Sequence, residues 1–223
     1  DNKIKNNSEN IIALMTPILK SFSTDVGCES ANLALQIYGG HGYIKDHGIE
    51  QLLRDVRITP IYEGTNGIQA LDLIGRKIQM NNGEVIKNFF SIINSYLETI
   101  DLNSELDISI NQFRKSYQDL IDVINYLESI DKSNYNEING PAVEFLELFS
   151  YVALGFVWLK MLIISKEKNN IKNNNFLESK IETGKFFFNK VLPKTTYLKK
   201  NILDGASTYN EYKDEYYDSA FSL

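Results

Sequence analysis

The sequence predicts an all-α protein, and three observations support this fold class. Hydrophobic residues make up 43% of the 223 residues and proline occurs only four times, so the composition is compatible with a packed helical core. Apolar residues recur at intervals of three and four, which places them on one face of a helix. No stretch keeps the alternation of apolar and polar residues that is typical of a half-buried strand.

Residues 1–80 are expected to form a first helical domain. The apolar spacing predicts three helices in it, at about 9–38, 49–55 and 65–79.

Glycine, proline and threonine are expected to mark where these helices begin, bend or end. Pro17 interrupts the first apolar pattern and is expected to start or kink a turn there. Gly39 and Gly40 are expected to end that helix, because glycine tolerates the positive φ that often follows a helix C-terminus. Residues 57–64 are expected to be extended and then to turn, so that Thr65 caps the next helix.

The break at Asn81-Asn82-Gly83 predicts a domain boundary, and residues 81–223 are expected to form a second helical domain. Pro141 is well suited to begin a helix, because its missing N–H is not needed in the first turn. The expected helices of this part are 86–100, 105–130, 141–168 and 176–192.

The charge balance argues against nucleic acid as a partner. The chain has 23 Lys and Arg against 29 Asp and Glu, a net charge of −6, whereas a nucleic-acid surface requires a concentrated basic face.

The single cysteine, Cys28, excludes an internal disulfide framework and suits a reducing compartment. The longest apolar stretch, Tyr151 to Ile164, contains Lys160 and is expected to be too short to span a bilayer. No signal peptide is recognised, so we predict a cytoplasmic location without membrane association. Because the chain begins with Asp1 instead of Met, we expect it to be a piece of a longer protein.

The run Ile61-Tyr62-Glu63-Gly64-Thr65 places one carboxylate on a tight glycine turn. Such a group can act as a base if it is within hydrogen-bond reach of a proton and sheltered from water. An apolar surrounding, here Ile61 and Tyr62, would make it a stronger base because desolvation disfavours its charged form. On spacing alone, a surface glutamate stabilised by the dipole of the following helix is the favoured interpretation, because glutamate before a helix is ordinary.

The run Gln36-Ile37-Tyr38-Gly39-Gly40-His41-Gly42-Tyr43 could let a backbone approach a phosphate closely. Taken alone, however, a plain helix stop is the favoured interpretation. The spacing of the run fits neither a P-loop nor a dinucleotide fingerprint. His41 and His47 have no Cys or further His near them in the sequence, so we predict no metal site.

These two runs, with Arg54-Asp55-Val56-Arg57 between them, resemble the C-terminal helical domain of the acyl-CoA dehydrogenases, which are flavoproteins, over residues 22–78. In addition, the run from Thr183 to Pro193 resembles the extra helical segment of a subgroup that includes the 3-methylmercaptopropionyl-CoA dehydrogenases. The resemblance implies the C-terminal half of the dehydrogenase helical bundle, followed by an additional helical bundle.

The resemblance also implies roles for the residues of the glycine turn. Glu63 would be the base that removes a proton next to a thioester carbonyl, Gly64 would lie against the acyl-CoA, and Thr65 against the flavin. Asn66 would be a further residue in contact with the cofactor. Many family members have glutamine two residues after the threonine, but this chain has Gly67, so that contact to FAD is absent.

For the upstream run, the resemblance implies that Gln36, Gly39 and Gly40 touch an FAD bound mainly by a neighbouring subunit, and therefore a homo-oligomer, either dimer or tetramer.

The leading hypothesis is thus an FAD-dependent acyl-CoA dehydrogenase that forms a 2-enoyl-CoA and passes electrons to an electron-transfer flavoprotein. The subgroup resemblance makes 3-methylthiopropanoyl-CoA a candidate substrate. This chain alone is expected to be inactive, because the family's other domains hold most of the FAD and CoA contacts. Two alternatives are a relative of the DNA-associated alkylation-response flavoproteins and a non-catalytic helical assembly module. Oxidase chemistry, with oxygen as the electron acceptor, is not distinguished by these residues.

Overall fold

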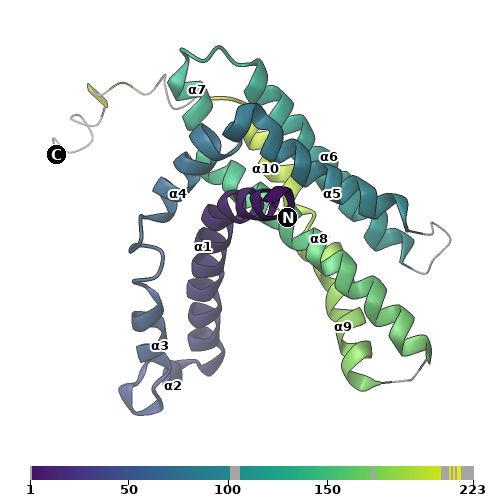
Figure 1. The fold of residues 1–223 in the computed structure, drawn as a ribbon. Coiled ribbons are helices and arrows are strands. Elements are labelled where there is room, and N and C mark those ends of the chain that lie inside the picture. Colours follow the sequence, from purple (N-terminus) through teal and green to yellow (C-terminus); the bar gives the residue numbers. More distant parts are fainter. Residues whose placement is uncertain are drawn as a thin grey trace. The chain divides into compact units, whose positions relative to one another are not determined.

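The computed structural model describes residues 2–100, 106–171 and 174–206, and also 211, 213, 215 and 216. Every regular element within these ranges is a helix, which confirms the predicted all-α class (Figure 1). The contacts between residues divide the chain into two units, Asp1–Lys87 and Asn88–Leu223. The division falls inside α5 (Glu84–Glu98), a few residues beyond the boundary expected between 80 and 81, which stays a prediction.

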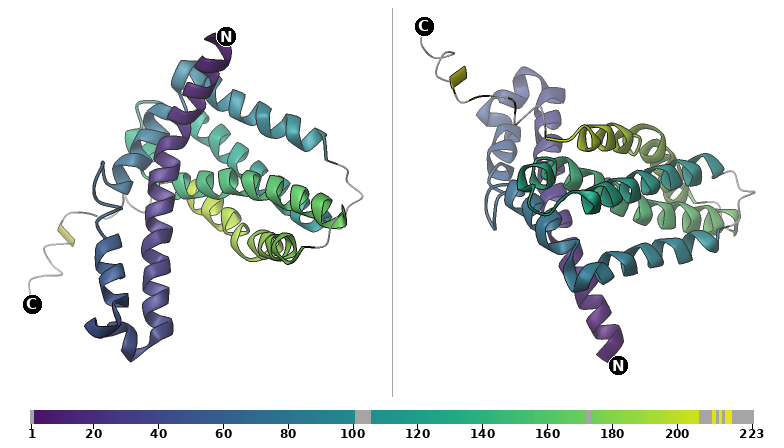
Figure 2. Two further views of the ribbon diagram at one scale, coloured as in Figure 1. Left: turned by 60° about the horizontal axis from the view of Figure 1, so that its bottom comes forward. Right: turned by 90° about the horizontal axis from the view of Figure 1, so that it is seen from above.

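The first unit is built on one long helix. α3 and α4 pack along α1, so the chain from α2 to α4 runs back beside it as a long hairpin (Figure 2). A π-helical turn, Leu73–Lys77, continues α4. The bounds are α1 (Asn2–Tyr38), α2 (Gly40–Tyr43), α3 (Ile49–Val56) and α4 (Asn66–Asp72).

The predicted interruption at Pro17 is wrong, because α1 passes through it. Proline removes one backbone hydrogen bond from a helix interior. Pro17 is buried here, and its neighbours Leu14 and Ile18 are 0% and 2% exposed, so their burial stabilises the helix against that loss. The stop at the glycine pair is confirmed: α1 ends at Tyr38, and Gly39 follows with φ 58°.

The segment before α4 is folded into successive turns instead of the extended backbone that the sequence predicts. The N–H of Thr59 donates to the carbonyl of Val56 at 3.0 Å, and the N–H of Ile61 to that of Ile58 at 3.0 Å. These local hydrogen bonds satisfy backbone groups that an isolated extended segment would leave to water.

The second unit is a bundle around α8 (Ala142–Ile171), which packs against α6, α9 and α10. Four phenylalanines are its largest fully buried side chains: Phe113, Phe145, Phe149 and Phe188. The expected helix 176–192 corresponds to α9 and the π-helical turn that continues it, Phe187–Val191. The helix after it, α10, was not predicted, and Pro193 precedes it as the N-cap residue. The other bounds are α6 (Asp107–Ser129), α7 (Tyr135–Asn139), α9 (Asn175–Phe186) and α10 (Lys194–Leu203).

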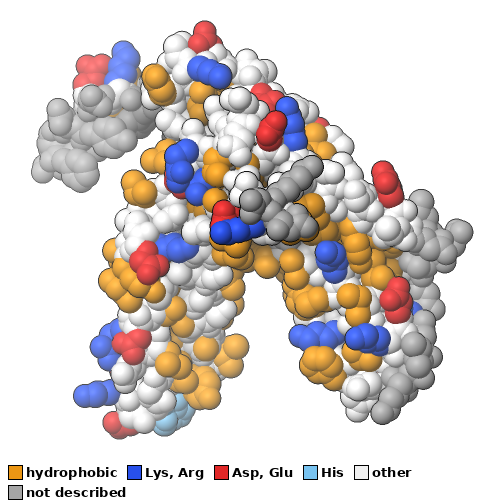
Figure 3. Space-filling model, viewed as in Figure 1, with side chains coloured by type: hydrophobic (Ala, Val, Ile, Leu, Met, Phe, Trp, Pro, Cys, Tyr) orange, Lys and Arg blue, Asp and Glu red, His pale blue; other side chains and the backbone are white. Residues whose placement is uncertain are grey.

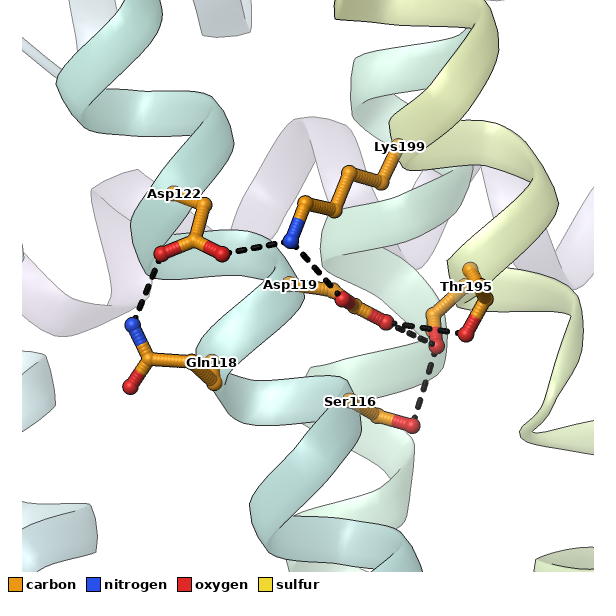
Figure 4. A network of polar contacts seen from close by, with 7 residues as sticks. Ser116, Gln118, Asp119, Asp122, Thr195 and Lys199 are labelled. Atoms are coloured by element: carbon orange, nitrogen blue, oxygen red, sulfur yellow. Dashed lines mark hydrogen bonds and ion pairs between the residues drawn. The ribbon is translucent and has the colours of Figure 1, made fainter.

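A polar network joins α6 to α10 inside this bundle (Figure 4). The Asp119 carboxylate, on a residue that is 5% exposed, lies 3.3 Å from the Thr195 hydroxyl and accepts from Lys199 Nζ at 3.2 Å. Lys199 Nζ also donates to Asp122, and this hydrogen bond is the main cause that lowers the pKa of the Asp122 carboxyl.

Two described helices are long and apolar enough to cross a membrane by length and composition alone, Ile4–Tyr38 and Ala142–Asn169. The apolar stretch Tyr151 to Ile164, expected to be too short to span a bilayer, lies within α8, which has 30 residues. Core helices of helical bundles can have the same length and apolar composition, and 56% of the most apolar part of α8 is buried within the chain.

Candidate active site

The backbone at Glu63 adopts an uncommon conformation. Glu63 has φ 56° and Gly64 has φ 80°, so two consecutive residues between α3 and α4 are left-handed. A side chain in this region is strained by roughly 1–2 kcal/mol, and such residues persist only where the surroundings hold them. The turn therefore directs the Glu63 side chain away from the path it would take in a helix or strand.

The start of α4 holds the turn from one side. Thr65 caps the helix as predicted: its Oγ1 accepts the N–H of Ile68 at 3.4 Å. The Gln69 side chain reaches back, and its Nε2 donates to the Glu63 carbonyl at 2.9 Å. Gln69 was given no role from the sequence, yet it fixes the carbonyl of the candidate base.

The other side of the turn is held by α1. Lys20 Nζ donates to the Gly64 carbonyl at 2.8 Å and to Asn66 Oδ1 at 2.8 Å. The Asn66 amide nitrogen donates to α1 as well, to Asp25 Oδ1 at 2.8 Å and to Thr24 Oγ1 at 3.0 Å. The residue that the resemblance assigned to the cofactor thus uses its side chain to bind this chain's own first helix.

The Glu63 side chain is exposed and makes no hydrogen bond or ion pair with the described residues. Ile61 and Tyr62, expected to form a dry wall beside it, are 48% and 49% exposed. The described part of the chain therefore presents the carboxylate without burying it, and shelter from water would have to come from other surfaces.

The glycine pair lies at the far end of the hairpin, after α1. The N–H of Gly39 donates to the Gln36 carbonyl at 3.1 Å, so the helix end is closed by its own backbone. A Cβ built at Gly39 or Gly40 would meet nothing within 4 Å, and the Gln36 side chain is exposed. This backbone is thus accessible to a ligand. Among the described residues, no hydrogen bond joins the glycine pair to Glu63, so the two candidate sites are separate.

The two histidines, which the sequence separates by six positions, meet in the structure. His41 Nδ1 and His47 Nε2 are 3.1 Å apart, and the rings are edge-on. Among the described residues, no group of three or more His, Cys, Asp and Glu side chains is placed to hold a metal ion.

Sequence reasoning missed Lys20 and Gln69. Gln69 lies one helical turn beyond the Thr65 cap, a spacing at which a side chain can reach back over the N-terminus. For Lys20 no local signal exists, because its partner Asn66 is 46 residues away.

Comparison with known families matches both parts of the chain. Residues 4–79 match the family described as "Acyl-CoA dehydrogenase, C-terminal domain". Residues 89–213, more than half of the chain, match the family described as "Acetyl-CoA dehydrogenase C-terminal like".

Curated relatives agree with these matches. A 3-methylmercaptopropionyl-CoA dehydrogenase of Ruegeria pomeroyi is 30% identical over 199 residues, which cover 88% of this chain and 34% of the relative. A butyryl-CoA dehydrogenase of Syntrophomonas wolfei is 25% identical over 83% of this chain and 31% of its own length. An acyl-CoA dehydrogenase of Bacillus subtilis is 56% identical over a shorter stretch of 52 residues, 23% of this chain and 14% of the relative.

A solved structure shares the fold. The acyl-CoA dehydrogenase of Bacillus anthracis, described as complexed with FAD, superposes with a TM-score of 0.67 at 17% identity, over 85% of this chain and 32% of that one. This chain spans about a third of the length of the curated relatives it matches most extensively. It belongs to the acyl-CoA dehydrogenase family and corresponds to the C-terminal part of those proteins.

Proposed function

We propose that this chain supplies the catalytic carboxylate of an FAD-dependent acyl-CoA dehydrogenase, with Glu63 as the base. One observation carries the proposal. The Glu63 carboxylate is exposed and unpaired among the described residues, while the backbone around it is held in a left-handed turn. A base needs both features, a free carboxylate and a fixed position, to reach a substrate proton reproducibly.

The proton chemistry follows from the carboxylate. The bond between the α-carbon of the acyl group and its hydrogen breaks, and the proton moves to a carboxylate oxygen of Glu63. The electron pair left behind forms the second bond between the α- and β-carbons as a hydride leaves the β-carbon. FAD, when bound, supplies the acceptor for that hydride. The product is a 2-enoyl-CoA.

The described residues fit a flavin cofactor in two places. The backbone at Gly39 and Gly40 is open, so a phosphate can approach it closely. Thr65 is exposed, and its hydroxyl only accepts a hydrogen bond from Ile68, which leaves the hydroxyl hydrogen for an acceptor on a ligand. Gln36, with an exposed amide beside the glycine pair, completes the set that we assign to the cofactor.

Exposed apolar side chains on the first unit support a homo-oligomer. Ile37 and Tyr43 are 83% and 80% exposed, and Leu52 is 60% exposed. Figure 3 shows hydrophobic side chains gathered on the lower part of this unit, around α2 and α3. Apolar patches of this kind mark surfaces that a second polypeptide or another domain covers.

The substrate class is an acyl-CoA. The relative from Ruegeria pomeroyi supports 3-methylthiopropanoyl-CoA as the first candidate, and that from Syntrophomonas wolfei supports butyryl-CoA as the second. Transfer of electrons to an electron-transfer flavoprotein is part of the same proposal. The cytoplasmic location stays a prediction.

The test is anaerobic bleaching of the flavin by a panel of acyl-CoAs, with the full-length protein that contains this chain. We expect the parent to bleach with at least one member of the panel. The Glu63→Gln variant should bind FAD normally but bleach at least about 10²-fold more slowly, since general-base catalysis contributes roughly that much. Glu128→Gln, at an exposed position on α6, is the matched control and should behave as the parent.

Equal bleaching by the parent and Glu63→Gln would show that the base lies elsewhere. A flavin-loaded parent that no acyl-CoA bleaches would reject the dehydrogenase proposal.

A further inference from the structure

We propose that Lys20 and Asn66 form a clamp that positions the Glu63 carboxylate, and that Asn66 acts through this clamp instead of touching the cofactor with its side chain. The inference rests on the proposed function, because it concerns how the proposed base is held. The clamp consists of Lys20, Asn66 and their contacts with the turn and with α1.

The Asn66 side chain is fully engaged by α1. Its Oδ1 accepts from Lys20, and its Nδ2 lies within hydrogen-bond distance of three acceptors, Ser21 O at 3.2 Å, Thr24 Oγ1 at 3.0 Å and Asp25 Oδ1 at 2.8 Å. The charges fix the orientation of the amide, because a flip would set its carbonyl oxygen against the Asp25 carboxylate.

The backbone of Asn66 is engaged too. Its N–H donates to the Pro60 carbonyl at 3.0 Å, which closes the segment of turns onto the first residue of α4. A direct contact between the Asn66 amide and a flavin would therefore have to break hydrogen bonds that include one to a carboxylate and one to an ammonium. Charge-assisted hydrogen bonds of this kind are the stronger ones in proteins.

Lys20 extends the clamp to the turn itself. Its Nζ donates both to Asn66 and to the carbonyl of Gly64, the residue directly after the proposed base. Gln69 on α4 donates to the Glu63 carbonyl, and Lys20 on α1 donates to the next carbonyl, that of Gly64. Two consecutive carbonyls are therefore each held by a side chain from a helix.

The consequence concerns geometry. The left-handed φ of Glu63 is costly and needs outside support, and the carbonyl of the next residue, Gly64, is held by Lys20. A turn that relaxes by about 1 Å would displace the carboxylate from the substrate, and a displacement of that size can slow a reaction by roughly 10²-fold. Lys20 and Asn66 are thus positioning residues, without contact to the reacting atoms.

The test uses the full-length, FAD-loaded protein and anaerobic single-turnover reduction of the flavin by butyryl-CoA, or by the panel member that bleaches the parent fastest. The variants are Lys20→Met, Lys20→Arg, Asn66→Ala and the double variant Lys20→Met/Asn66→Ala. Lys5→Met is the matched control, because Lys5 lies on the same helix, is exposed and pairs only weakly with Glu9, at 3.9 Å. FAD content and melting temperature are measured for each variant.

We expect the limiting rate of flavin reduction to fall about 10- to 100-fold in Lys20→Met and in Asn66→Ala. The half-saturating substrate concentration and the FAD content should stay close to those of the parent. Lys20→Arg, which keeps the charge and the donors, should recover most of the rate. The double variant should lose little more than either single variant, because both remove the same clamp. Lys5→Met should match the parent.

Three results would overturn the inference. The first is a parent-like rate in Lys20→Met at normal FAD content. The second is an Asn66→Ala protein that loses FAD yet keeps the rate per bound flavin, which would assign Asn66 to the cofactor. The third is a multiplicative loss in the double variant. The Glu63→Gln variant distinguishes failure of the clamp inference from failure of the proposed function. If Glu63→Gln reduces the flavin slowly while Lys20→Met reduces it at the parent rate, only the clamp inference fails. If Glu63→Gln reduces the flavin at the parent rate, the proposed function itself is rejected.

Discussion

At the scale of single residues, the most informative feature is the pair of left-handed residues at the turn. Glutamate has no intrinsic preference for φ 56°, so its conformation reports the surroundings instead of its own propensity. Glycine at position 64 tolerates φ 80° without strain. The two residues therefore share one backbone shape for different reasons, and substitution should affect them differently.

Replacing Gly64 by alanine should destabilise the first unit by about 1 kcal/mol or more, because the new Cβ is strained at positive φ. That Cβ would also lie 3.3 Å from Gln69 Nε2, the atom that holds the Glu63 carbonyl. The measurement is the free energy of unfolding from urea titration of the chain.

Gly75→Ala is the matched control for this substitution. Gly75 lies in the π-helical turn after α4, and a Cβ there would meet nothing within 4 Å. It should be neutral or stabilise by about 0.5–1 kcal/mol. A Gly64→Ala chain as stable as the parent would show that the turn does not need its left-handed form.

At the scale of elements, the second unit joins α6 and α10 by charge as well as by apolar packing. Lys199 donates from α10 to Asp119 and Asp122 on α6, while the Thr195 hydroxyl lies 2.9 Å from Ser116 Oγ. Asp122 is the more accessible of the two carboxylates, with 37% of its side chain exposed against 7% for Asp119.

The stability contributed by Asp122 should depend on pH. The hydrogen bond from Lys199 lowers the pKa of the Asp122 carboxyl below its ordinary value of 3.8, so the folded state binds the proton less tightly than the unfolded state. The contribution is therefore present above pH 3.8 and is lost as the pH falls through the lower, folded pKa. Asp122→Asn should lower the free energy of unfolding at pH 7 by a few tenths of a kcal/mol to about 1 kcal/mol, since the pair is partly exposed.

The same comparison near pH 2 should show a much smaller difference between parent and Asp122→Asn. Urea unfolding at both pH values checks this, with Glu128→Gln on the same helix as control. A difference that is identical at the two pH values would mean that the pair adds nothing as an ion pair.

Much of the fold could be predicted at this scale, and the failures have physical causes. The helix stop at Tyr38 and the Thr65 cap follow from local backbone chemistry, which a sequence carries directly. Pro17 was misjudged because proline signals a break, whereas tertiary burial keeps α1 continuous through it. The helix that follows Pro193 was missed, although proline is common at the start of a helix. The contact between Lys20 and Asn66 joins residues 46 apart, and no periodicity encodes it.

At the scale of the whole molecule, the chain presents candidate site residues without enclosing them. Glu63 and Gln36 are exposed, as are Gly39 and Gly40. The chain also covers only about a third of the length of the relatives that it matches most extensively. Binding of a cofactor with both a flavin ring and a dinucleotide tail requires more surface than these open positions offer.

The chain on its own should therefore purify without flavin and should not oxidise any acyl-CoA. Absorbance in the visible flavin bands, measured after incubation with excess FAD and gel filtration, checks this. The full-length protein treated in the same way is the control and should retain flavin. Stoichiometric flavin on the isolated chain would contradict the expectation and would place most cofactor contacts within it.

The attachment of the turn to α1 has a consequence for how sequences of this kind can change length. Lys20 of α1 is hydrogen-bonded to the turn that carries Glu63, although the chain between Lys20 and Glu63 passes through α2 and α3. Insertions or deletions at residues 44–48 should leave the carboxylate where it is, because α3 is held by its packing along α1. One extra residue within α1 between Lys20 and Asp25 would instead rotate one clamp partner by about 100° relative to the other. Length variation among relatives should therefore be tolerated at the tip of the hairpin and excluded from that single turn of helix.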